Sequence, residues 1–94
     1  MEKAGSFSVV LESVTENLAI KIHKISKIPV IGIGASNKCD GQILVTEDLL
    51  GLLDRSPKFA KNYENLRSKI RKAVKKYCTD VINRNFPSKN NIYT

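Results

Sequence analysis

The chain has 94 residues, of which 41% are hydrophobic, and it carries a formal net charge of +7 at pH 7. This length and composition exclude a disordered chain and indicate one small domain or a part of a larger one. No apolar run approaches the length of a membrane span, and no secretory signal peptide is recognisable. We therefore expect a cytoplasmic protein that has no membrane partner.

The first predicted strand covers residues 7–13 and follows a short helix that stops at Gly5. The apolar run of this strand ends in Glu12. A carboxylate in that position is either solvated at the rim of a sheet or takes part in chemistry. Thr15 then predicts the N-cap of an amphipathic helix. The core stripe of this helix recurs at helical spacing and consists of Leu18, Ile22 and Ile25.

A second predicted strand, over residues 28–33, is almost wholly apolar and β-branched, as is typical of a parallel strand covered on both faces. Alternation divides the residues of this stretch between two sides, with Val30, Gly32, Gly34 and Ser36 on one and Ile31, Ile33 and Ala35 on the other. Glycines in a strand mark a close approach by a ligand or a backbone, or they relieve crowding in the sheet. Strand, helix and strand in this order indicate a right-handed βαβ unit.

Residues 37–41 predict a loop, and residues 42–45 predict a third short strand. Thr46 then predicts the start of a helix over residues 47–53, with Gly51 inside it. Three strands, each followed by a helix, indicate an α/β fold with parallel strands.

The last part of the chain reads as helical. Pro57 suits the first turn of a new helix. Apolar residues at steps of three and four predict a long amphipathic helix over residues 63–83, and residues 88–94 form a polar tail.

Positive charge is concentrated in residues 55–76, which carry nine Lys and Arg residues and one acidic residue, Glu64. No aromatic residues interleave with this run as a base-stacking surface would require. The run therefore favours a solvated helix face. A small basic module that binds nucleic acid is the alternative from a different functional class.

The two cysteines, Cys39 and Cys78, and the single histidine, His23, cannot complete a tetrahedral zinc site without outside ligands. We expect reduced thiols in a cytoplasmic protein. His23 lies off the apolar stripe of its helix, so we expect it to be exposed rather than a ligand.

Several motifs, in matching order and spacing, make the chain similar to one enzyme family, ketopantoate hydroxymethyltransferase (3-methyl-2-oxobutanoate hydroxymethyltransferase). The resemblance covers essentially the whole chain. The motifs are VLE at residues 10–12, IPVIGIGA at 28–35, CDGQILV at 39–45, PKF at 57–59 and FP at 86–87.

The resemblance implies a (β/α)₈ barrel enzyme of pantothenate synthesis. That family transfers a hydroxymethyl group from 5,10-methylenetetrahydrofolate to the keto acid 3-methyl-2-oxobutanoate, uses Mg²⁺ and forms homo-oligomers. A full barrel needs about 250 residues. The chain would then be a single partial domain supplying strands six to eight, with residues 1–54 as a βαβαβα barrel segment and residues 55–94 as closing helices and tail.

The resemblance also implies a role for Glu12, which matches the general base of the family. That base removes the C3 proton of the keto acid, and the resulting enolate attacks the one-carbon unit. No position here matches the metal ligands or the substrate lysine of the family, which lie in its N-terminal two-thirds, so we assign no metal ligand. Asp40 is the one carboxylate that could substitute as a metal ligand, but it belongs to a loop turn.

Two residues depart from the family pattern: Ser36 replaces a usual glycine and adds bulk at the end of the strand, and Asn91 stands near the usual position of a histidine. The missing half of the site predicts little activity of the chain alone. Three parallel strands leave two unpaired edges, which predicts poor stability or self-association. A non-catalytic subunit that completes a barrel with an N-terminal partner is a further alternative.

Overall fold

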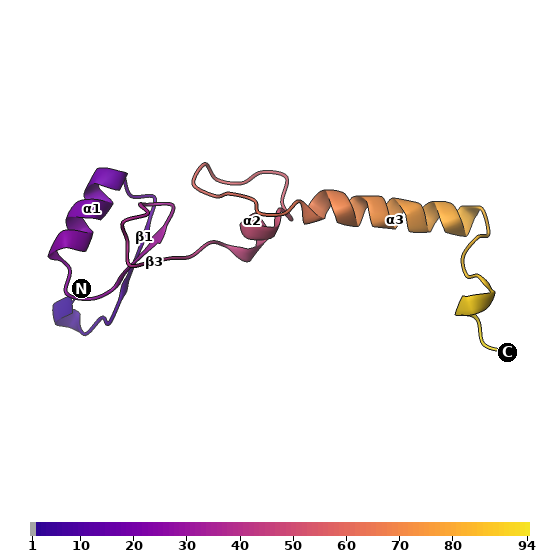
Figure 1. Cartoon of the computed structure of the whole chain (residues 1–94), viewed down its shortest axis with the longest axis horizontal. Helices are drawn as coiled ribbons and strands as arrows, with labels where there is room; N and C mark the ends of the chain where they lie inside the picture. Colours follow the sequence, from indigo (N-terminus) through magenta and orange to yellow (C-terminus); the bar gives the residue numbers. More distant parts are fainter. Residues whose placement is uncertain (1) are drawn as a thin grey trace.

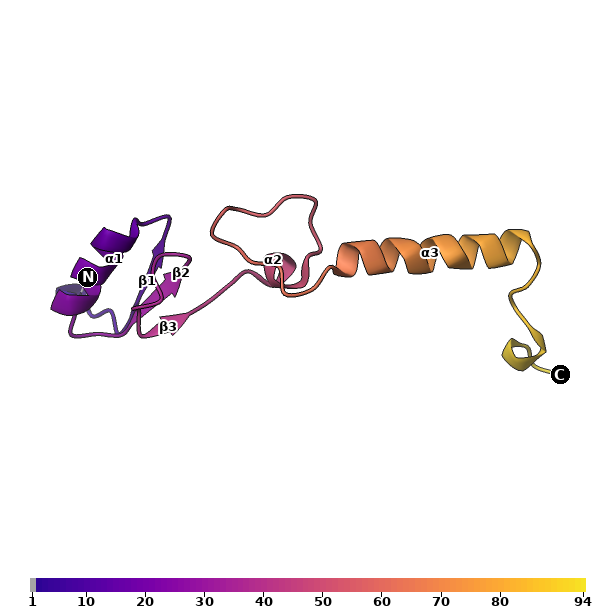
Figure 2. The same ribbon diagram turned by 45° about the horizontal axis from the view of Figure 1, so that its top comes forward.

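A computed structural model of the chain describes residues 2–94 and shows an elongated molecule (Figure 1). Its dimensions are 68 × 28 × 18 Å and its radius of gyration is 22.2 Å. A compact chain of this length would have a radius of gyration of about 12 Å. The C-terminal half therefore extends away from the sheet instead of packing against it (Figures 1 and 2).

The secondary structure alternates between strands and helices before it ends in one long helix. In chain order the elements are η1 (Glu2–Ala4), β1 (Val9–Glu12), α1 (Glu16–Ile25), β2 (Val30–Ile33), β3 (Gly41–Gln42), α2 (Thr46–Leu50), α3 (Leu66–Ile82) and η2 (Lys89–Asn91). No helix among residues 2–94 is both long enough and apolar enough to cross a membrane.

The three strands form one parallel sheet in the order β1-β2-β3, which confirms the predicted α/β class. In the β1–β2 pair, Val9 lies opposite Val30 and Glu12 opposite Ile33. The third strand is shorter and starts earlier than the predicted strand over residues 42–45. Its pairing ends with the bond from Ile43 N to the Gly32 carbonyl at 3.0 Å, because the next residues leave the sheet edge to enter α2.

A small core lies between α1 and one face of the sheet. Leu11, Ala19 and Val30 are buried in it, with Ile22 packed partly against them. The predicted helix stripe was wrong in its position, because Leu18 and Ile25 are 49% and 80% exposed. The fully buried Ala19 forms the centre of the contact, since its small side chain lets the helix approach the strands closely.

The segment between α2 and α3 contains no helix at Pro57, so that prediction was wrong. Ala60 N bonds to the Pro57 carbonyl at 3.0 Å in a single turn, and Tyr63 N donates to the Leu49 carbonyl at 2.8 Å. The segment thus forms one turn of its own and is also bonded to α2. Gly51 ends α2 in a left-handed conformation instead of lying inside a helix. A side chain does not fit at this position, because a Cβ would overlap with the Glu64 carbonyl oxygen.

Helix α3 begins later than predicted, after Asn65, whose side-chain oxygen accepts the Ser68 N–H at 3.3 Å. None of its residues is buried. Its apolar stripe is exposed to a similar degree along its length, with Ile70 at 52%, Val74 at 55% and Tyr77 at 56%. Apart from the edge contact between the rings of Tyr77 and Phe86, whose centres are 5.6 Å apart, no described element covers the stripe.

Candidate active site at the carboxyl ends of the strands

Glu12 is the last residue of β1, and its side chain is exposed. Val9 and Leu11 pack in the core beneath α1, so alternation places Glu12 and Val10 on the opposite face of the sheet. Val10 is 52% exposed, so the described chain leaves the β1 part of this face open, whereas Ile33, which lies opposite Glu12 on β2, is buried. In a parallel α/β barrel the face away from the helices is the interior of the barrel.

The chain turns sharply on both strands at this end of the sheet. Ser13 follows Glu12 with φ of 58°, a conformation that few non-glycine residues adopt. Gly34 follows Ile33, the register partner of Glu12, with φ of 69°. Both turns occur directly after the last residue of the strand, so the ends of β1 and β2 form one edge.

Phe59 covers the end of β2. A Cβ on Gly34 would overlap with the Cβ and ring atoms of Phe59, so any larger residue at this position must displace Phe59. Gly32, inside β2, is also closely approached by side chains. A Cβ at this position would lie 3.1 Å from Cys39 Sγ and 3.2 Å from Gln42 Oε1. Both close approaches are thus made by side chains of this chain.

Next to Gly34 lies a hollow of about 510 Å³. The apolar side chains of Leu44, Leu49 and Phe59 line it together with Lys61 and Tyr63. The Lys61 ammonium lies 4.8 Å from the centre of the Tyr63 ring, a cation–π arrangement. The sequence patterns did not single out these last two residues, because they lie in a segment that was predicted to be helical.

Ser36 is buried in the loop that follows β2. Its hydroxyl accepts the Lys38 N–H at 3.1 Å, and its carbonyl accepts a hydrogen bond from Gln42 Nε2 at 2.6 Å. The serine side chain therefore closes the loop. The expected alternation of sides ends at Ile33, because Gly34 is left-handed and Ala35 and Ser36 are both buried.

Asp40 lies at the other end of the sheet. Its carboxylate accepts the N–H of Val30, the first residue of β2, at 2.8 Å, and His23 Nε2 lies 3.1 Å from its second oxygen. The Val30 N–H, and after it His23, hold the pKa of the Asp40 carboxyl below its usual value. His23 is half-buried against this carboxylate instead of free in solvent, a contact that residues so far apart in sequence do not reveal. Asp40 thus anchors β2 and α1.

The residues between 2 and 94 offer no metal site of their own. They contain no group of three or more His, Cys, Asp or Glu side chains close enough to hold an ion. Because a hard cation such as Mg²⁺ requires carboxylate or other oxygen ligands, the described side chains do not fit the ion that the family resemblance implies.

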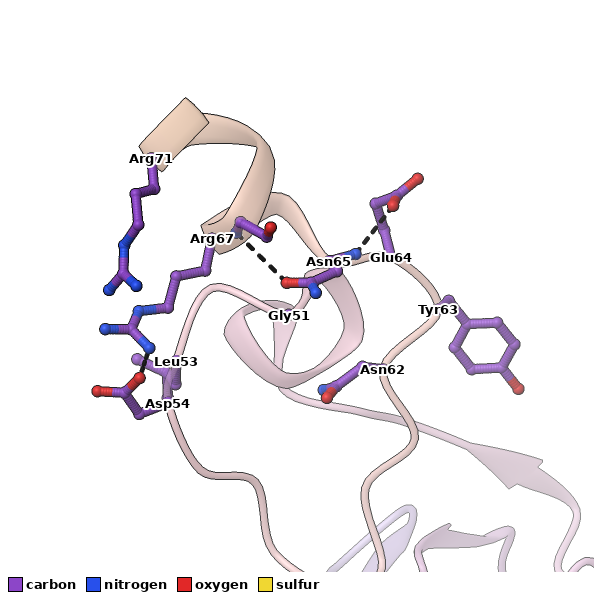
Figure 3. A pocket seen from close by; sticks show the side chains of 10 residues that line it. Gly51, Leu53, Asp54, Asn62, Tyr63, Glu64, Asn65, Arg67 and Arg71 are labelled. Atoms are coloured by element: carbon purple, nitrogen blue, oxygen red, sulfur yellow. Dashed lines mark hydrogen bonds and ion pairs between the residues drawn. The ribbon is translucent and has the colours of Figure 1, made fainter. Parts of the chain in front are cut away.

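A second hollow, of about 630 Å³, lies between the end of α2 and the start of α3 (Figure 3). It is the larger of the two, but it lies beyond α2, away from the strand ends. Arg67 pairs with Asp54 across it, and the Arg67 N–H bonds to the Gly51 carbonyl at 3.0 Å. Glu64 accepts from the Asn65 N–H at 2.9 Å. These contacts fix the first turn of α3 to the end of α2.

A parallel βαβ unit whose loops gather at the carboxyl edge of the sheet is the framework of α/β enzymes, whose active sites lie at that edge. A sequence model of ketopantoate hydroxymethyltransferase matches residues 1–89 of the chain. The chain belongs to the ketopantoate hydroxymethyltransferase family.

Individual relatives carry the same activity in their names. A protein of Zymomonas mobilis named 3-methyl-2-oxobutanoate hydroxymethyltransferase 2 is 56% identical over 92 residues, which are 98% of this chain and 34% of the relative. The 3-methyl-2-oxobutanoate hydroxymethyltransferase of Bartonella henselae is 53% identical over 93 residues, which are 99% of this chain and 34% of that protein. The chain therefore spans about a third of the length of the curated relatives it matches.

Proposed function

We propose that this chain supplies strands six to eight of a (β/α)₈ barrel that acts as a 3-methyl-2-oxobutanoate hydroxymethyltransferase, with Glu12 as its general base. The observation that supports this most is the position of Glu12. It ends β1 on the face away from α1, which is the interior face in a barrel, and at the edge where barrel active sites lie. Family membership supplies the reaction class.

In this proposal the Glu12 carboxylate takes the proton from C3 of 3-methyl-2-oxobutanoate. The electron pair of the broken C–H bond moves into the C2–C3 bond, and the carbonyl oxygen takes the negative charge of the enolate. C3 of the enolate then forms a bond to the one-carbon unit of 5,10-methylenetetrahydrofolate, whose two bonds to the folate nitrogens break, so that tetrahydrofolate leaves. Water supplies the hydroxyl oxygen of ketopantoate and the protons of the two released nitrogens, and the proton taken up by Glu12 returns to the new alkoxide. A positioned base contributes about 10²–10⁴-fold to such a reaction.

The rest of the proposed site lies outside this chain. The ligands of the expected Mg²⁺ would come from other strands of the barrel, because residues 2–94 provide no such group. The exposed Glu12 would also need cover from solvent, which the open face of the sheet does not give it.

We further propose that the chain acts together with a complement that provides the N-terminal two-thirds of the barrel, and that the complete protein is a cytoplasmic homo-oligomer. Three features support the complement: β1 and β3 are edge strands with free backbone groups, Val10 lies bare on the open face, and the apolar stripe of α3 is uncovered. A barrel removes both strand edges by pairing them.

The test is complementation. The purified chain is assayed for ketopantoate formation with Mg²⁺, alone and mixed with a separately produced N-terminal two-thirds of the Zymomonas mobilis relative. We expect activity only in the mixture, and its loss with Glu12→Gln. Glu16→Gln, on the exposed first turn of α1, is the matched control and should retain activity. A Glu12→Gln mixture as active as the unchanged one would exclude Glu12 as the base.

A further inference from the structure

The positive charge of the C-terminal half is gathered on one side of α3. None of the residues of this helix is buried, and the helix stands clear of the sheet (Figure 1). Two of its cations pair with carboxylates near its start, Arg67 with Asp54 and Lys69 with Glu64. The next four cations are exposed and take part in no ion pair within residues 2–94. They form the basic face, which consists of Arg71, Lys72, Lys75 and Lys76.

The basic face points away from the apolar stripe of the same helix. An α-helix turns by about 100° per residue. Lys72, two positions after Ile70, therefore lies about 200° around the helix from it. Lys76 stands in the same relation to Val74, and the other two cations lie about 100° from the stripe. A partner that covers the stripe, such as the proposed complement, thus leaves the basic face open to solvent.

The basic face has a high density of positive charge. Its four cations fall within residues 71–76, which span about 9 Å of helix, or about one charge per 2.3 Å. The single acidic residue of α3, Asp80, lies one turn beyond Lys76 at the end of the face and forms no ion pair with it. Double-stranded nucleic acid carries one negative charge per about 1.7 Å of its axis. Its charge density therefore matches that of the basic face.

The composition of the face distinguishes between polyanions. A site for single-stranded nucleic acid stacks bases on aromatic side chains, but the aromatic residue of α3, Tyr77, belongs to the apolar stripe. An anionic membrane takes up the apolar side of an amphipathic helix, and these cations face the other way. A flexible acidic peptide loses conformational entropy when it aligns with a rigid helix, a cost that a stiff duplex does not incur.

We propose that the basic face of α3 binds the phosphate backbone of double-stranded nucleic acid, without regard to base sequence. Arginine can donate two hydrogen bonds to one phosphate, and each lysine acts as a point charge. Contacts of this kind supply essentially all of the affinity in non-specific binding. This binding is separate from the proposed hydroxymethyl transfer, because no residue of the basic face lies at the carboxyl edge of the sheet.

The test measures how binding depends on salt. A short fluorescein-labelled DNA duplex is titrated with the full 94-residue chain, and fluorescence anisotropy is recorded between about 50 and 200 mM salt. Each phosphate contact adds about 0.9 to the steepness of log K against log salt concentration. Four contacts therefore contribute a slope of about −3.6, which corresponds to a loss of affinity of about 150-fold over this range.

Glutamine variants remove the charges while keeping a good helix former at each position. The pair Lys72→Gln and Lys76→Gln should make the slope shallower by about 1.8, and the fourfold variant, which also carries Arg71→Gln and Lys75→Gln, by about 3.6. Far-UV circular dichroism checks that the helix content is unchanged. The matched control removes four exposed charges outside α3 and should keep the slope. It carries Lys21→Gln, Lys24→Gln, Lys27→Gln and Lys38→Gln.

The comparison of variants decides between a defined face and a general attraction. A control variant that flattens the slope as much as the fourfold variant would reduce the binding to the net charge of +7 and overturn the assignment. A fourfold variant that keeps the slope of the unchanged chain would overturn it as well. Duplexes of different sequence should bind equally, and a preference of more than about tenfold would contradict contacts made to phosphates alone.

Two further titrations address the choice of partner and the accessibility of the face. The single strand of the same sequence, poly-L-glutamate and phosphatidylserine vesicles should each bind more weakly than the duplex, and tighter binding of any of them would refute the choice of partner. Adding the N-terminal two-thirds of the Zymomonas mobilis relative should leave the difference in slope between the unchanged chain and the fourfold variant intact. A difference that disappears would show that the complement covers the basic face.

Discussion

Replacing Gly34 with alanine tests how the edge of the sheet is built. The left-handed backbone at this position costs a non-glycine residue about 1–2 kcal/mol, and the new Cβ would displace Phe59. Removing a half-buried phenylalanine from its contact forfeits about 1 kcal/mol, half or less of the value of full burial. The folded form should therefore lose about 2–3 kcal/mol in total, which corresponds to about 30- to 140-fold in an equilibrium constant.

The assay is the affinity of the chain for the N-terminal two-thirds of its relative, measured by calorimetry. Because we expect the chain alone to be poorly stable and to fold as it associates, destabilising its folded form weakens association by the same factor. Gly5→Ala is the control for the backbone term, since Gly5 has φ of 96° and no atom within 4 Å of a new Cβ. In a Phe59→Ala background, Gly34→Ala should retain only its backbone cost. The effects of the two substitutions on the affinity should therefore be coupled by about fivefold, the worth of the lost packing. Strictly additive effects of the two substitutions would refute the packing of Phe59 on Gly34.

The other predictions concern the anchor of β2 and the small core. The Val30 N–H and His23 lower the pKa of Asp40 in the folded chain. The contribution of Asp40 to stability is therefore present above the pKa of about 3.9 that the group has in the unfolded chain. This contribution is lost as the pH falls through the lower pKa of the folded chain. Urea titrations of the complemented protein between pH 2 and about 6 should show this acid-side loss, and Asp40→Ala should remove it; an unchanged slope would contradict the anchor. Leu11→Ala should cost about 2–3 kcal/mol in the same titration, and Leu18→Ala on the exposed side of α1 clearly less. Equal costs would place the core elsewhere.

Local periodicity was enough to predict the βαβ unit and the long C-terminal helix, because both elements show their pattern within a short window of sequence. It misplaced the face of α1, since the sequence pattern gave most weight to Leu18 and Ile25 while the actual contact is made by the small Ala19. It also predicted a helix at Pro57, because the bonds that hold this segment to α2 join residues 14 positions apart. Such contacts leave no local signal.

The candidate site was predictable to a similar extent. Glu12 stood out because it ends an apolar strand, and in the structure it is exposed on the face away from α1, as alternation requires. The neighbouring hollow was not predictable, because it depends on Phe59 reaching Gly34 from 25 positions away. The His23–Asp40 pair joins residues 17 positions apart and was likewise invisible in the sequence.

The most direct test of the central proposal follows a single proton. The complemented protein is incubated with 3-methyl-2-oxobutanoate in D₂O without folate, and exchange of the C3 hydrogen is followed by NMR. We predict exchange that falls by about 10²–10⁴-fold in Glu12→Gln while Glu16→Gln exchanges at the original rate. Exchange that is equally fast in both variants would show that Glu12 is not the base, whatever else the assembled barrel does.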